Sequence, residues 1–228
     1  EGKVLLLDSV SGEIVKKDNH FERNEGSSDV SWPVWSIAVR PDGKGFMAAG
    51  GGGVSFFDFS VSAKGLGAEY TRQLLMPASS KDRADGTSSQ DILCSRYNDS
   101  KVNEKLLVAV GLLDSTVRLY YDDSLKFLLS LYGHKLPVMA IDMSYDSTIL
   151  ASGSADKTIK LWGLDFGDCH RSLLAHEDSV TCVRFQPNTH YFFSSSKDGV
   201  LKYWDADRFE QILFLPGHKG SCWSLVVS

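Results

Sequence analysis

The chain has 228 residues, 43% hydrophobic and 23% charged, a composition typical of one large globular domain. Its net charge of −5 argues against binding nucleic acid through a broad basic face. No apolar run approaches the roughly 18 residues of a membrane-spanning helix, and the four cysteines, which form no CxxC pair, are expected to be free thiols in a reducing compartment.

The N-terminal third predicts divergent strand units. Residues 3–15 resemble two strands of an incomplete unit, and a fuller unit spans about residues 30–75. Its glycine run, Gly50–Gly53, could cradle a phosphate, but such loops precede a helix, whereas a strand-like run containing Phe57 follows here. We therefore interpret it as a turn. The polar segment 79–90 is predicted to be a surface insertion.

From residue 91 onward the sequence repeats with a period of 42 residues. Three kinds of marker keep this spacing: a histidine, an aspartate and an aromatic residue six positions after the aspartate. They are His134, His176 and His218; Asp114, Asp156 and Asp198; and Tyr120, Trp162 and Trp204. The first unit is the most divergent, because Ile92 stands 42 positions before His134. Three independent markers on one period indicate true structural repeats.

Within each repeat, short alternating segments predict four strands. In the second repeat they are Val138–Met143, Ile149–Ser152, Thr158–Trp162 and Arg171–Leu174. Four short strands in about 40 residues are typical of a propeller blade. We predict an all-β fold, one incomplete β-propeller over residues 1–228, with about four blades and a partial blade at each end. The expected segments are a partial blade at 1–15, blades at about 30–75, 91–131, 138–174 and 180–215, and a partial blade at 222–228.

Histidine, serine and aspartate recur together and could be taken for a catalytic triad. An active site is normally assembled once in a domain, whereas this set occurs in two successive repeats. We therefore predict a structural hydrogen-bond network in each, with its members buried and in mutual contact. The predicted networks are His134, Ser152, Asp156 and Trp162, and His176, Ser194, Asp198 and Trp204.

Two further residue groups could carry binding chemistry. Arg118, Lys160 and Lys202 share one position of the repeat, and with Lys81 and Arg83 of the insertion they are candidates for RNA contact. The alternative is that each stem packs beside an aromatic ring while its charge reaches solvent. The segment 165–170 contains aspartates, a cysteine and a histidine but lacks the spacing of zinc ligands, so no metal site is predicted.

The markers resemble the WD repeat, and Trp204-Asp205 is a literal WD dipeptide. The segments Leu112–Tyr120, Leu125–Leu131, Ser130–Val138 and Leu161–Ser172 are similar to the WD-repeat protein three family, the WD-repeat subunit of the UTP-B subcomplex of the small-subunit processome. Departures from the family are the glycine turn at Gly50–Gly53 and the insertion. WD propellers usually close with seven blades, so the resemblance implies a piece of a longer protein with tandem propellers.

The resemblance implies a non-enzymatic scaffold, without cofactor, for assembly of the small-subunit processome and processing of its pre-ribosomal RNA. The implied partners are other WD-repeat proteins of the UTP-B subcomplex, and the small nucleolar RNA particle and pre-ribosomal RNA, contacted directly or indirectly. No membrane or small-molecule substrate is expected, and the implied location is the nucleolus within the nucleus. The alternative is an adaptor or substrate receptor of a ubiquitin ligase or signalling complex, because propellers host many functions.

Overall fold

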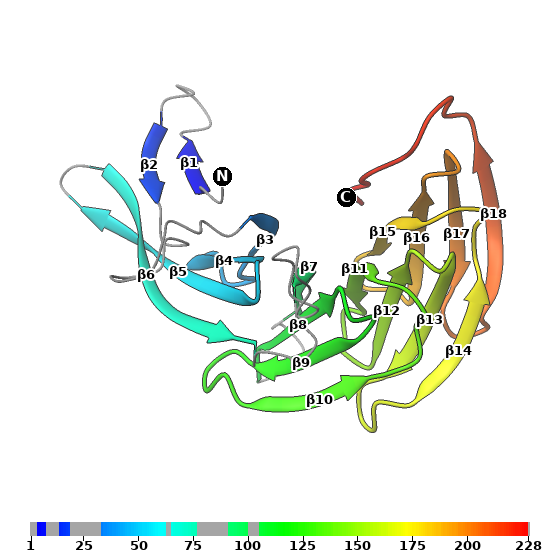
Figure 1. Cartoon of the computed structure of the whole chain (residues 1–228), viewed down its shortest axis with the longest axis horizontal. Coiled ribbons are helices and arrows are strands. Elements are labelled where there is room, and N and C mark those ends of the chain that lie inside the picture. Colours follow the sequence, from blue (N-terminus) through cyan, green and yellow to red (C-terminus); the bar gives the residue numbers. More distant parts are fainter. Residues whose placement is uncertain are drawn as a thin grey trace, which may run out of the picture. The chain divides into compact units, whose positions relative to one another are not determined.

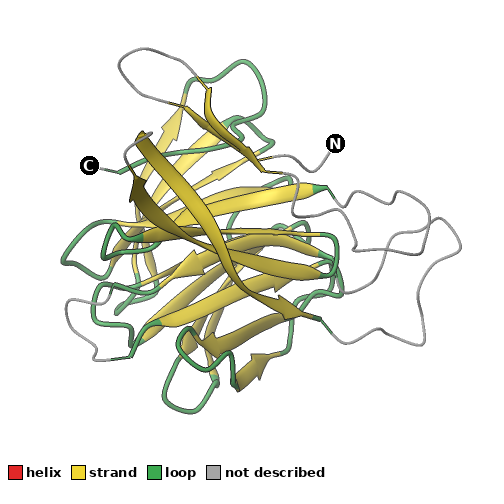
Figure 2. Ribbon diagram, turned by 90° about the vertical axis from the view of Figure 1, so that its left-hand side faces the viewer, coloured by secondary structure: helices red, strands yellow, loops and turns green. Residues whose placement is uncertain are grey.

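We describe a computed structural model of the chain. The structure describes residues 4–7, 14–18, 33–62, 65–76, 91–99 and 105–227. These residues form strands and connecting loops (Figure 2), and they contain no helix long and apolar enough to cross a membrane. The predicted all-β propeller class is confirmed by four four-stranded antiparallel sheets. The predicted insertion at 79–90 lies outside the described residues.

Each four-stranded sheet is a blade whose strands are hydrogen-bonded in chain order (Figure 1). The first blade contains β3 (Val34–Val39), β4 (Gly45–Gly50), β5 (Gly53–Ser62) and β6 (Gly65–Leu75). The second contains β7 (Ile92–Tyr97), β8 (Leu107–Leu112), β9 (Val117–Tyr121) and β10 (Phe127–Leu131). The third contains β11 (Val138–Met143), β12 (Ile149–Ser154), β13 (Thr158–Gly163) and β14 (Cys169–Leu174), and the fourth β15 (Val180–Phe185), β16 (Tyr191–Ser196), β17 (Val200–Asp205) and β18 (Glu210–Pro216).

The chain divides into two compact units, Glu1–Ile92 and Leu93–Ser228. The first unit contains an antiparallel hairpin of β1 (Val4–Leu7) and β2 (Ile14–Asp18) together with the first blade. The core of that blade includes Phe46, stacked on Phe57 with ring centroids 4.8 Å apart. The second unit contains the other three blades and the functional features described below.

Neighbouring blades of the second unit bury an apolar layer between them. Ile159 and Leu161 of the third blade pack in one cluster with Val180, Val183 and Trp204 of the fourth. The second and third blades share a similar cluster, drawn from their facing sheets. Each blade therefore covers the hydrophobic face of its neighbour, which no single small sheet could bury alone.

Small residues let the blades approach this closely. A Cβ added to Gly153 of β12 would lie 2.5 Å from Val180 Cγ1 and 3.0 Å from Val183 Cγ2. Gly111 of β8 occupies the same repeat position as Gly153. A Cβ added to it would lie 2.9 Å from Val138 Cγ1. At both places the strand backbone of one blade packs directly against a valine of the next.

Two sequence-based predictions fail in detail. Ile92 does not occupy the histidine position: it is the first residue of β7, as Val138 is of β11. The cause is a longer loop after β7. In the second blade the N–H of Asn98 donates to the carbonyl of Leu107, nine positions later, whereas in the third blade the N–H of Ser144 donates to the carbonyl of Ile149, five positions later. The four extra residues shift everything before the loop out of the 42-residue period.

The second failure concerns the partial blade predicted at 222–228. Residues 217–227 contain no strand, and residue 228 lies outside the described residues. The segment instead runs beside β15, where the Thr181 hydroxyl donates to the Cys222 carbonyl and the Cys182 thiol to that of Leu225. The Cys222 N–H also donates to the Ser196 carbonyl at 3.1 Å, but a strand assignment requires a ladder of backbone pairs, and the described residues of this segment form none.

Candidate functional site: the blade networks and an inter-blade groove

The third blade holds a buried chain of hydrogen bonds. His134 Nδ1 lies 2.9 Å from Asp156 Oδ2, and His134 Nε2 lies 2.7 Å from Ser152 Oγ. The indole N–H of Trp162 donates to the same serine oxygen at 2.8 Å. Thr158, on the turn side of β13, adds a hydroxyl bond to Asp156. The structure thus brings together four residues that are separated by up to 28 positions in the sequence.

The fourth blade repeats this geometry. His176 Nδ1 lies 3.0 Å from Asp198 Oδ2, and His176 Nε2 lies 2.8 Å from Ser194 Oγ. The Trp204 indole N–H donates to Ser194 at 2.9 Å. These four residues connect the turn between the second and third strands to the segment that enters the blade. They therefore hold that turn and that segment together at one end of the sheet.

Burial favours a neutral imidazole in both networks. Burial lowers the pKa of His134 despite the hydrogen bond to Asp156, and it does the same to His176 beside Asp198. For Asp156, burial favours the neutral acid, but hydrogen bonds from Thr158 and Lys135 outweigh it and lower the pKa to about 2. Neutral His134 then donates from Nδ1 to the carboxylate and accepts from the Ser152 hydroxyl at Nε2, which satisfies every member.

In the first two blades, apolar or aromatic side chains stand at the serine and tryptophan positions of the network. In the second blade, Val110 stands 42 positions before Ser152 and Tyr120 stands 42 before Trp162; both are buried. In the first blade, strand register places Ala48 at the serine position and Phe57 at the tryptophan position. The glycine run of that blade forms the β4–β5 turn and leads into a strand, as predicted from the sequence.

The basic row of β9, β13 and β17 is engaged within its own blades. Arg118 forms an ion pair with Asp114 at 3.2 Å, and Lys160 Nζ donates to Ser172 Oγ at 2.9 Å. Lys202 Nζ donates to the Ala175 carbonyl and lies 5.8 Å from the centre of the Trp204 ring. The charged ends of all three residues are thus bonded to polar partners, and Lys202 also has the aromatic contact of the packing alternative. Lys81 and Arg83 lie outside the described residues.

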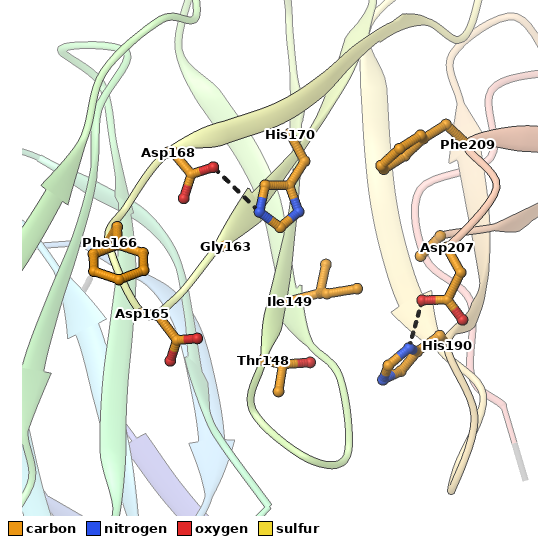
Figure 3. Close-up of a pocket in the computed structure, with 11 residues that line it drawn as sticks. Thr148, Ile149, Gly163, Asp165, Phe166, Asp168, His170, His190, Asp207 and Phe209 are labelled. Carbon is orange, nitrogen blue, oxygen red and sulfur yellow. Dashed lines mark hydrogen bonds and ion pairs between the residues drawn. The ribbon is translucent and has the colours of Figure 1, made fainter.

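At the opposite end of the blades, a groove of about 450 Å³ lies between the third and fourth (Figure 3). One wall is the β13–β14 turn, with Asp165, Phe166, Asp168 and His170. The other wall comes from the turns of the fourth blade, and the floor from the start of β12. The groove is therefore built by turns that are far apart in the sequence.

His190 stands on the second wall as a bridge between blades. Its Nδ1 lies 2.8 Å from Asp207 Oδ1 and its Nε2 lies 3.0 Å from Asp146 Oδ2 of the third blade. Partial burial opposes protonation of His190, but the two carboxylates outweigh it and raise its pKa. Both ring nitrogens face acceptors, which is the arrangement that an imidazolium satisfies.

Sequence reasoning treated 165–170 only as a poor metal site and missed the groove. Among the described residues, no group of three or more histidines, cysteines, aspartates or glutamates is placed to hold a metal; Asp168 Oδ2 lies 3.3 Å from His170 Nε2. A signal was present, because Asp123, Asp165 and Asp207 recur at the 42-residue period. Aspartate is common in turns, so this spacing alone did not distinguish a binding surface from aspartates that only stabilise turns.

The four-stranded blades, the recurrent His–Ser–Asp–Trp network and the tight inter-blade layers define a WD-repeat β-propeller. The chain belongs to the family of the second β-propeller domain of WDR3, whose family model matches residues 1–228.

Known proteins similar to this chain include human WD repeat-containing protein 3, 43% identical over 144 residues, which are 60% of this chain and 13% of that protein. U3 small nucleolar RNA-associated protein 12 of Saccharomyces cerevisiae is 41% identical over 148 residues, 62% of this chain and 15% of that protein. The matched part is therefore a small fraction of each relative. A solved structure of U3-55K has the same fold, with a TM-score of 0.68, 18% identity, and coverage of 85% of this chain and 55% of that chain.

Proposed function

We propose that this chain is part of a non-enzymatic scaffold subunit that assembles the small-subunit processome and supports processing of its pre-ribosomal RNA. The observation that carries the proposal is the family match over residues 1–228, joined to 41% identity with a yeast protein named for its association with U3 small nucleolar RNA. The proposed partners are other WD-repeat proteins of the UTP-B subcomplex and the small nucleolar RNA particle. The proposed location is the nucleolus.

The geometry supports a scaffold role in a second way. The histidine, serine and aspartate that resemble a triad are repeated in two blades, and in each the serine oxygen accepts the tryptophan indole N–H. Each serine is completely buried, so no substrate carbonyl could reach it. These groups therefore support the blade rather than a reaction.

The test is affinity purification of the tagged full-length protein at low salt, followed by identification of its proteins and sequencing of its RNA. A tagged WD-repeat receptor of a ubiquitin ligase, purified in parallel, is the control for general propeller stickiness. We expect other processome WD-repeat proteins, U3 small nucleolar RNA and small-subunit pre-ribosomal RNA to be enriched over the control. Enrichment of ubiquitin-ligase or signalling subunits, without pre-ribosomal RNA, would overturn the proposal.

A further inference from the structure

The groove between the third and fourth blades combines an exposed aromatic ring with acidic walls. Phe166 is 90% exposed at the tip of the β13–β14 turn, and it lies between Asp165 and Asp168 in sequence. Figure 3 shows these three side chains on one wall and Asp207 on the facing wall. An aromatic side chain this exposed contributes little to the core of its own blade, and its ring is open to a ligand that enters the groove.

The carboxylates of the groove keep capacity for another ligand. The Asp168 and Asp207 side chains are 57% and 63% exposed. Asp168 contacts His170 through Oδ2, and Asp207 contacts His190 through Oδ1. The other oxygen of each carboxylate lies outside that contact. Asp165 is exposed and forms no ion pair within the described parts of the chain. An anion such as an RNA phosphate would be repelled here.

The positive groups nearby do not cancel this charge. His190 is held between Asp207 and Asp146, so its positive charge is already matched by two carboxylates. Arg208 lies 4.0 Å from Asp205, its side chain is 78% exposed, and it does not line the groove. The lining contains three aspartates, Asp165, Asp168 and Asp207, and two histidines, His170 and His190, so an excess of negative charge remains beside an exposed ring.

Backbone geometry places a second ring on the facing wall. Phe209 has a φ of +58°, where the equivalent residue of the third blade is Gly167 with a φ of +74°. The equivalent residue of the second blade is Leu125, with a φ of +53°, so the left-handed turn is shared by the repeats and in the fourth blade it carries an aromatic ring. Phe209 packs on the core of its blade and also lines the groove.

We propose that this groove binds an arginine side chain presented by an extended segment of a partner protein. The guanidinium is planar, forms forked hydrogen bonds with carboxylates and stacks on aromatic rings, so it suits the aspartates and Phe166 together. Ile149, which is buried, and Thr148 provide the floor for the aliphatic stem. The proposal does not depend on which complex contains the protein.

The test uses the full-length protein and a fluorescent acetyl-Gly-Arg-Gly-Arg-Gly peptide, with binding followed by fluorescence anisotropy. The matched probe replaces both arginines with citrulline, which keeps the shape and removes the charge. We expect the arginine peptide to bind at least about tenfold more tightly, since charged hydrogen bonds are the strong ones. Equal binding of the two peptides would overturn the proposal.

Variants locate the site on the protein. Asp165→Asn with Asp168→Asn, and separately Phe166→Ala, should each weaken binding of the arginine peptide several-fold. Glu177→Gln, an exposed charge change at the opposite end of the fourth blade, should leave it unchanged. Because the altered groove side chains are exposed, the variants should fold, and amide exchange over residues 158–174 verifies this. Unchanged binding by both groove variants, or competition by a single-stranded RNA oligonucleotide for the same residues, would contradict an arginine site.

Discussion

The residue at one strand position differs between blades that carry the buried polar network and blades that lack it. Ser152 and Ser194 each form hydrogen bonds with a histidine and a tryptophan. The same position is occupied by Ala48 in the first blade and by Val110 in the second. In those blades the tryptophan is also replaced, by Tyr120 and Phe57. The serine and the tryptophan are replaced together because they bond to each other, so the loss of one would leave the other without this partner.

Asp198→Ala should lower the stability of the fourth blade by about 1–3 kcal/mol, the cost of leaving buried partners unsatisfied. Asp198 accepts hydrogen bonds from His176 and from the backbone N–H groups of Glu177 and Val200. The measurement is amide hydrogen exchange of the full-length protein over residues 176–204. Asp165→Ala, at an exposed turn, is the control. Unchanged protection in Asp198→Ala would show that the network does not support the blade.

His190→Gln should destabilise the contact between the third and fourth blades in a pH-dependent manner. Because the folded-state pKa of His190 is raised above 6.5, its contribution is complete below pH 6.5 and disappears as the pH rises through the raised value. The difference in protection factors between the natural protein and the variant should therefore shrink with increasing pH. Peptides covering residues 186–207 provide the measurement, and His218→Gln is the control. A difference that grows with pH would refute the bridging role.

At the scale of the blade, the repeat and its alternating segments predicted much of the fold. The four strands predicted for the second repeat agree with β11 to β14 to within two residues at each end, because each inner face must present the same apolar pattern to its neighbour. The prediction failed at Ile92, where a longer loop breaks the period, and at 217–227, where strand formation depends on pairing that local sequence does not encode.

The groove was less predictable than the network. The network residues share one repeat, so their spacing marks them, whereas the groove joins Asp165 of one turn to Asp207 of the next blade's turn. Its left-handed turn position is occupied in successive blades by Leu125, Gly167 and Phe209, so no residue type marks it. Only packing of whole blades brings such residues together.

Gly153→Ala should loosen the layer between the third and fourth blades by about 1–3 kcal/mol, the usual cost of overpacking a tight interface. The added methyl would lie 2.5 Å from Val180 Cγ1, a distance that requires a shift of the valine or the strand. Gly220→Ala is the matched control, because a Cβ there has no neighbour within 4 Å among the described residues. Amide exchange of β12 and β15 should increase in the first variant only. Equal exchange in both variants would mean that the layer tolerates the methyl group.

At the scale of the whole molecule, the charge of the chain favours assembly through protein contacts. The net charge is −5, the basic row is engaged within its blades, and the groove is acidic. Binding that depends on many phosphate contacts weakens steeply with salt, whereas contacts made by shape and apolar area do not. The proposed scaffold should therefore keep its protein partners at moderate salt.

The most direct measurement is co-precipitation of protein partners by a full-length variant in which Arg118, Lys160, Lys202, Lys81 and Arg83 are all replaced by alanine. Amide exchange over residues 107–174 first establishes that the variant is folded. We predict that processome proteins are retained at both low and moderate salt, even where crosslinking to pre-ribosomal RNA weakens. Loss of those proteins at low salt, from a folded variant, would show that the basic residues carry the assembly and would contradict a scaffold held by protein contacts.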